Sequence, residues 1–269
     1  MKFSDTLHVS LQLLLRHRFF ALGAFVLIAV LLAAALAAQF GARQPATLAL
    51  DTGLSVLKLV LPLFIVIQVQ QLFTSEFERK FYLLSLSYPV SRLQWFAARF
   101  AALLIVTFAL LSVSVGLLAL EVSIISQGYS QPTPVSLGMP LGVTTLFIAL
   151  DLLVLLALAC FLAVVASTPS FVLIGTLGFM LIARSYSTVL ALLASNATLV
   201  DNAETYRGSL GILGYLLPDL GALDSRMIAL YGKMSFLPSD WPLLVGSATF
   251  YALGLIALTI WFFQRKQFT

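Results

Sequence analysis

The chain has 269 residues, of which 61% are hydrophobic and 10% are charged, and its formal net charge at pH 7 is +4. Because soluble domains carry roughly 25% charged residues, this composition excludes an ordinary soluble fold and predicts an all-α, polytopic membrane protein. The net charge is too small to indicate a nucleic-acid partner. The single cysteine, Cys160, lies within an apolar run, which excludes a disulfide framework or a thiol pair.

Residues 1–18 form an amphipathic start to the chain. Ser4 can cap a helix, and leucines at positions 7, 11, 14 and 15 fall on one helical face. This pattern predicts a helix that lies in the membrane interface. Residues 19–38 follow as a first span without a charge. A cleaved signal peptide is the alternative, because Ala35-Leu36-Ala37 resembles a cleavage site, but the apolar run exceeds the ~7–15 residues of a signal core.

Further apolar stretches long enough to cross about 30 Å of hydrocarbon lie at residues 53–73, 95–120, 141–166, 171–195 and 243–263. Residues 39–52, between the first two spans, are expected to form a polar loop. The second span contains Lys58, whose long side chain can reach the interface, and Pro62, which can kink a helix that its neighbours support. The sequence therefore predicts six spans in a single transmembrane domain over residues 1–269.

The distribution of lysine and arginine predicts the orientation of these spans. The side that holds both termini contains Lys2, Arg16, Arg18, Arg79, Lys80, Arg92, Arg99, Arg265 and Lys266, whereas the opposite loops contain only Arg43, Arg207, Arg226 and Lys233. Because cytosolic segments are enriched in these residues, we expect both termini in the cytosol.

Residues 196–242, which precede the last span, contain two short apolar pieces at 210–217 and 220–231. Neither is long enough to cross a membrane. We expect short helices there that dip into the outer leaflet. A seventh span is excluded because it would place Arg265 and Lys266 on the wrong side.

The segment at residues 75–92 is a polar interruption between the second and third spans. Its apolar residues recur at positions 77, 81, 84 and 88, on one face of a helix that Pro89 ends. The charged residues at its start are Glu76, Glu78, Arg79 and Lys80. Two interpretations stay open: a solvated connecting loop, and an amphipathic helix that offers its polar surface to a cytosolic partner.

Two ionisable residues, Asp151 and Arg184, fall deep inside the fourth and fifth predicted spans. The turn Ser167-Thr168-Pro169-Ser170 joins these spans, and counting along antiparallel helices from this turn places the two residues at similar depth. Charges within a span are usually paired, so we predict an ion pair. A structural pair that fixes helix register is favoured over a substrate or proton site.

Motifs for catalysis are missing from the sequence. There is no GxxxxGK[ST] loop for ATP, no HExxH and no GxSxG. The histidines, His8 and His17, precede the first span and cannot supply a buried metal cluster. We therefore expect no catalytic, cofactor-binding or metal-binding residues in this chain, which disfavours an enzyme.

The polar segment reads Glu76-x-Glu78-Arg79-Lys80-x-x-x-Leu84-Ser85-x-x-x-Pro89-x-Ser91-Arg92. With six spans and an amphipathic start, it resembles the cytosolic signature of the ABC-2 type permeases, the membrane subunits of type V ABC transporters. Leu216-Leu217-Pro218-Asp219-Leu220 is similar to the outer region of that family, especially in the branch grouped with multicopper-enzyme maturation permeases. The resemblance covers the whole chain in topology.

The resemblance implies a half-transporter in the inner (plasma) membrane of a bacterium. A second permease copy or paralogue would pair with it, and a dimer of separate ABC ATPase subunits would bind ATP and Mg and dock from the cytosol. The residues that the resemblance assigns to ATPase coupling are Glu76, Glu78, Arg79, Lys80, Leu84, Arg92, Ser167 and Thr168.

The expected function is that of an ABC exporter permease, which couples ATP hydrolysis in the partner to outward movement of a substrate. The alternatives are an ATP-driven mechanotransmitting, maturation or immunity complex without solute flux, and an ion-coupled secondary transporter. A secondary transporter would need further acidic residues inside the spans.

Overall fold

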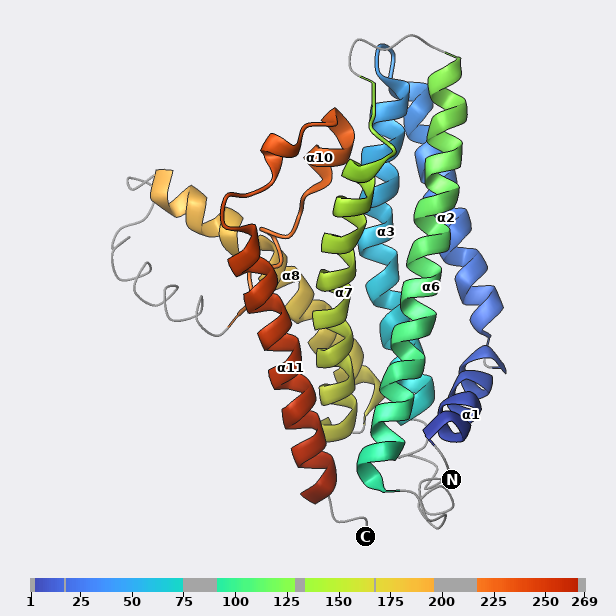
Figure 1. The fold of residues 1–269 in the computed structure, drawn as a ribbon, viewed down its shortest axis with the longest axis vertical. Coiled ribbons are helices and arrows are strands. Elements are labelled where there is room, and N and C mark those ends of the chain that lie inside the picture. Colours follow the sequence, from blue (N-terminus) through green and yellow to red (C-terminus); the bar gives the residue numbers. More distant parts are fainter. Residues whose placement is uncertain are drawn as a thin grey trace.

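In a computed structural model of the chain, every regular element of the described residues is a helix (Figure 1). The structure describes residues 3–16, 18–74, 91–128, 134–166, 168–195 and 217–265. The helices in chain order are α1 (Phe3–Arg16), α2 (Phe19–Phe40), α3 (Pro45–Val69), α6 (Arg92–Gln127), α7 (Met139–Ala166), α8 (Pro169–Ser195), α10 (Arg226–Tyr231) and α11 (Trp241–Arg265). A π-helical turn, η1 (Gln70–Thr74), continues α3, and a 3-10 helix, η2 (Met234–Phe236), precedes α11.

Six helices in the described part of the chain are long and apolar enough to cross a membrane. They are α2, α3 with η1, α6, α7, the Pro169–Tyr186 part of α8, and α11. The chain is therefore an all-helical, multi-pass membrane protein, as its composition predicts. Helix α1 and the last turn of α11 lie at the same end of the bundle, which we call the termini end (Figure 1). The opposite end, where α2 turns into α3, is called the far end.

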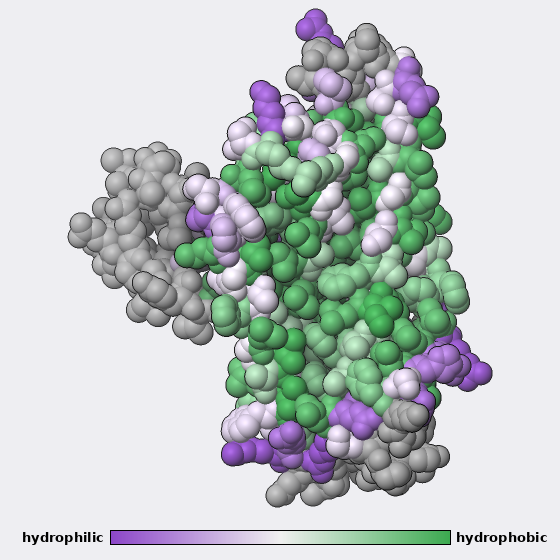
Figure 2. Space-filling model, in the orientation of Figure 1, coloured by the Kyte–Doolittle hydropathy of each residue, from purple (hydrophilic) through white to green (hydrophobic). Residues whose placement is uncertain are grey.

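The bundle is built around α3 and α7. Their most apolar stretches are 61% and 67% buried within the protein, against 22% for α2, α8 and α11. Figure 1 accordingly places α3 and α7 between α2 and α6 on one side and α8 and α11 on the other. The outer helices expose a green apolar belt, with hydrophilic patches at both ends of the molecule (Figure 2). Such a belt suits contact with lipid chains rather than with water.

Helix α3 begins earlier than the sequence predicts. Residues 45–52, expected within a polar loop, form its first turns, and only residues 41–44 connect it to α2. Pro45 occupies the start of the helix, where a missing backbone N–H leaves no hydrogen bond unmade. As a consequence, Asp51, Ser55 and Lys58 stand four and seven residues apart on one face of a single helix.

The amphipathic helix α1 is present, and its leucine face is confirmed in part, because Leu7 and Leu11 pack against the core. Leu14 is buried, whereas Leu15 is exposed, and Thr6 and Ser10 complete the buried face. Helix α1 packs against α6. The hydroxyl of Ser10 remains satisfied there because it donates to the carbonyl of Thr6 at 2.9 Å. The helix begins at Phe3, so Ser4 lies inside its first turn and does not precede it as a cap.

The region before α11 is only partly described. The predicted apolar piece at 210–217 lies outside the described residues except for Leu217. The second piece is less helical than its spacing indicates, because residues 220–223 form a turn and α10 covers only Arg226–Tyr231. The carboxylate of Asp219 stabilises that turn by accepting from the backbone N–H of Ala222 at 3.0 Å. Gly232 ends α10 in the left-handed conformation, with φ of 64°.

Candidate functional site

The sequence-predicted coupling residues fall into two groups. Most of them lie outside the described residues: Glu76, Glu78, Arg79, Lys80, Leu84 and Ser167. Arg92 and Thr168 are described: Arg92 begins α6 and Thr168 directly precedes α8, and both helices begin at the termini end (Figure 1). The residues that flank positions 75–90 are also described, and they form a set of contacts that we call the clamp: Gln70, Leu72, Arg92, Arg99 and Pro169.

On the amino-terminal flank, the clamp holds η1. The guanidinium of Arg99 donates from Nη1 to the carbonyl of Leu72 at 2.6 Å. The same guanidinium lies 3.8 Å from the centre of the Trp95 ring, a cation–π contact. The side-chain amide of Gln70 donates to the carbonyl of Pro169 at 2.8 Å, at the start of α8. The last described residues before position 75 are therefore attached to α6 and to α8.

On the carboxyl-terminal flank, the clamp holds the start of α6. Ser91 caps this helix, since its hydroxyl accepts from the backbone N–H of Gln94 at 3.2 Å. Arg92 donates from Nη1 to the carbonyls of Gln264 at 3.0 Å and Phe263 at 3.5 Å, in the last turn of α11. Carbonyls at a helix end lack partners within the helix, so a cationic donor stabilises them.

Aromatic rings pack between the two flanks of the clamp. The Trp95 ring stacks on Phe263 with centroids 5.2 Å apart, and Phe73 lies edge-on to Trp95 at 5.9 Å. Phe96 contacts Phe73 at 5.7 Å. These rings come from η1, α6 and α11, and all four are buried. The polar contacts of the clamp thus surround a packed apolar centre that joins the three elements.

Thr168 lies at the turn between α7 and α8. Its carbonyl accepts from the backbone N–H of Val172 at 3.3 Å, which closes the first turn of α8. Its side chain is exposed at the termini end. Because Pro169 follows it directly, the clamp contact from Gln70 and this exposed residue belong to the same turn.

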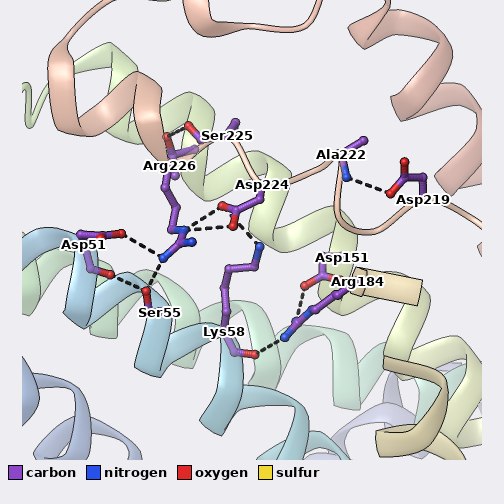
Figure 3. Close-up of polar contacts among 11 residues, drawn as sticks. Asp51, Ser55, Lys58, Asp151, Arg184, Asp219, Ala222, Asp224, Ser225 and Arg226 are labelled. Atoms are coloured by element: carbon purple, nitrogen blue, oxygen red, sulfur yellow. Dashed lines mark hydrogen bonds and ion pairs between the residues drawn. The ribbon is translucent and has the colours of Figure 1, made fainter. Parts of the chain in front are cut away.

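A second group of charged residues lies inside the bundle, nearer the far end. The predicted partners Asp151 on α7 and Arg184 on α8 are in contact, with Arg184 Nη2 2.5 Å from Asp151 Oδ2 (Figure 3). Arg184 also donates from Nη1 to the backbone carbonyl of Lys58 at 2.9 Å. Asp151 is fully enclosed at 1% exposure, so this contact supplies the neutralisation that a charge within a span requires.

The pair adjoins a chain of contacts that sequence analysis missed. Lys58 Nζ lies 3.5 Å from a carboxylate oxygen of Asp224, in the segment before α10. Arg226 Nε binds both oxygens of Asp224, at 2.8 and 3.1 Å, and its Nη1 lies 2.9 Å from Asp51. Arg226 also donates to the hydroxyl of Ser55. We call Asp51, Ser55, Lys58, Asp151, Arg184, Asp224 and Arg226 the ionic network (Figure 3).

The ionic network joins α3, α7 and α8 to the segment before α10, and its charges cancel. Three negative charges, on Asp51, Asp151 and Asp224, are balanced by three positive charges, on Lys58, Arg184 and Arg226. Burial alone would raise the pKa of Asp224, but the hydrogen bonds from Arg226 and the nearby Lys58 ammonium outweigh it, so that pKa is lowered. Burial lowers the pKa of Arg226, and the Asp224 carboxylate reverses this, so that pKa is raised.

One signal in the sequence could have located this network. Asp51, Ser55 and Lys58 have the spacing of one helical face, but the helix was expected to begin after Asp51. Asp224 and Arg226, by contrast, lie in the piece at 220–231, where the spacing predicts a short helix but does not indicate that these side chains contact α3.

The described residues contain no cluster of three or more His, Cys, Asp and Glu side chains that could hold a metal ion. The clamp ties together four elements at one end, and the ionic network ties α10 and the segment before it to the bundle. Comparison with known proteins yields no matching family model and no matching curated protein.

Proposed function

We propose that this chain is the membrane-spanning permease subunit of an ABC exporter in the plasma membrane of a bacterium. A dimer of separate ABC ATPase subunits binds ATP and Mg and docks on residues 75–92 and on the turn at residues 167–168. A second permease copy or paralogue completes the transporter. Outward movement of a substrate is driven by the ATPase and not by this chain.

The observation that carries this proposal is the clamp. Residues 75–90 are bounded on both sides by residues that are held to other spans, through Gln70 to α8, through Arg99 to α6 and through Arg92 to α11. A force applied to this segment would therefore be transmitted to several helices at once rather than absorbed by a loose loop. A solvated connecting loop has no need of such attachments.

The ionic network gives little support to the alternative of an ion-coupled transporter. Coupling to protons or sodium needs an acidic side chain that can exchange its partner. The three carboxylates of the network each have a cationic partner within 3.5 Å. These contacts suit a part of the bundle that stays in place while the helices tilt at the termini end.

The proposal is tested by co-purification with an ABC ATPase encoded beside this chain. Wild type and the double variant Glu76→Lys plus Glu78→Lys are expressed with that ATPase, and the amount retained in detergent is measured. Asp240→Lys, an exposed reversal of charge at the far end, is the control. We expect wild type and the control to retain the ATPase and the double variant to lose it, because the docking charges then repel.

Two other outcomes are informative. Retention of the ATPase by the double variant would move the docking surface away from residues 75–80. Absence of the ATPase from the wild-type preparation under all conditions would contradict the permease role. Once docking is established, solute flux is measured with and without ATP. Flux that requires ATP indicates an exporter, whereas a mechanotransmitting complex shows no solute flux in either condition.

A further inference from the structure

A pocket at the far end of the bundle has no part in the proposed ATPase coupling. Its volume is about 950 Å³, and it lies where the connection between α2 and α3 meets α10. Arg43 comes from that connection, Asp51 from α3, and Asp224 and Arg226 from the segment at α10. The pocket therefore combines charged groups from three parts of the chain.

The charges of this pocket leave one cation unmatched. Arg226 binds the carboxylates of both Asp51 and Asp224. Lys58 Nζ also lies 3.5 Å from a carboxylate oxygen of Asp224. Arg43 is exposed and makes no hydrogen bond or ion pair with another described residue. The two carboxylates Asp51 and Asp224 are thus outnumbered by Arg43, Arg226 and Lys58, which contacts Asp224 but does not line the pocket, so a ligand with a single negative charge would restore balance.

Several further residues of the lining are apolar and exposed. Phe40 is 81% exposed, Met227 45% and Leu48 38%. From Phe40, exposed leucines continue at four-residue intervals along α2, at Leu36 and Leu32. Side chains at this spacing lie one above another on a helix, so they form an apolar track from the pocket into the hydrocarbon belt.

We propose that this pocket binds the headgroup of a monoanionic phospholipid. The phosphate lies at Arg43, whose guanidinium forms strong, charge-assisted hydrogen bonds with phosphate oxygens. An acyl chain follows Leu36 and Leu32 along α2. The position fits this ligand, because hydrophilic surface meets the apolar belt at the far end of the molecule (Figure 2). The proposal does not depend on the permease role.

Binding is tested with the purified full-length protein in detergent, using a fluorescent short-chain phosphatidylglycerol and a phosphatidylcholine of equal chain length. The variant is Arg43→Gln, and the control is Lys233→Gln, an exposed cation at the same end that does not line the pocket. We expect wild type and the control to prefer phosphatidylglycerol equally. Arg43→Gln should bind it about tenfold more weakly, the loss expected for a charge-assisted contact.

Because Arg43 supports no other described side chain, its replacement should leave the fold intact, which an unchanged thermal unfolding curve would verify. Unaltered binding by Arg43→Gln would overturn the proposal, and so would equal binding of the two lipids. Glycerol 3-phosphate should not displace the lipid even in large excess. If it competes as well as phosphatidylglycerol, the pocket binds soluble phosphate esters and the assignment to lipid is wrong.

Discussion

The carboxylate of Asp151 illustrates how this bundle tolerates charge. It is enclosed within a span, where an unpaired charge is costly. Arg184 contacts only one of its two oxygens, and Asp151 Oδ1 has no hydrogen bond to any described residue. Loss of Arg184 would therefore leave the whole carboxylate without a partner, whereas loss of both charges would leave no uncompensated group.

We accordingly expect Arg184→Gln to destabilise the protein by about 3 kcal/mol, the lower range for breaking a buried ion pair. The double variant Asp151→Asn plus Arg184→Gln should recover most of this loss, because it removes the orphaned charge. Thermal unfolding in detergent measures both, with Lys233→Gln as an exposed control. A double variant that is no more stable than Arg184→Gln would show that the two residues do not act as a pair.

At the scale of elements, the segment before α10 is attached to the bundle by polar contacts as well as by the buried side chains of Leu220 and Leu223. Arg226 and Asp224 bind α3 through Asp51 and Lys58, and the hydroxyl of Thr144 on α7 donates to the carbonyl of Ser225 at 3.1 Å. The Asp224 side chain is 30% exposed, so water reaches part of this network. The polar part of this attachment should respond to pH, whereas its apolar part should not.

The expected response follows from the pKa of Asp224, which is held below its ordinary value of 3.8. A carboxylate whose pKa is lowered by folding stabilises the folded state at pH values above its ordinary pKa. This contribution is lost as the pH falls through the lower pKa of the folded state. Asp224→Asn should therefore be about 1 kcal/mol less stable than wild type near neutral pH, with the gap closing below about pH 4.

Unfolding curves of wild type, Asp224→Asn and the exposed control Asp240→Asn across this pH range provide the measurement. The control should follow wild type throughout. A gap for Asp224→Asn that stays constant as the solution is acidified would mean that its charge does not hold the segment in place.

At the scale of the whole molecule, the sequence alone predicts those features that depend on residues close together in the chain. Runs such as residues 19–38 and 243–263 gave the spans, because uninterrupted apolar length has few other uses. The contact between Asp151 and Arg184 was predictable because a short turn fixes their relative depth. The clamp was not, since Arg92 and Arg99 bind backbone carbonyls, and carbonyls carry no sequence signal.

Charge at the two ends of the bundle gives the last prediction, the orientation in the membrane. Among the described residues, the termini end holds five arginines and Asp5, whereas the far end holds three cations, Arg43, Arg226 and Lys233, together with acidic residues that include Asp51, Asp224 and Asp240. By the bias of cytosolic segments toward lysine and arginine, the termini end should face the cytosol.

Single cysteines introduced at exposed sites test this orientation in intact cells, after Cys160, which is buried, is replaced by alanine. A membrane-impermeant maleimide should label Ser239→Cys at the far end directly, and Ser4→Cys on α1 only after the membrane is permeabilised. The Cys160→Ala protein alone should stay unlabelled. The reverse order of labelling would place residues 75–92 outside the cell, where no ATPase could reach them, and would contradict the proposed function together with the orientation.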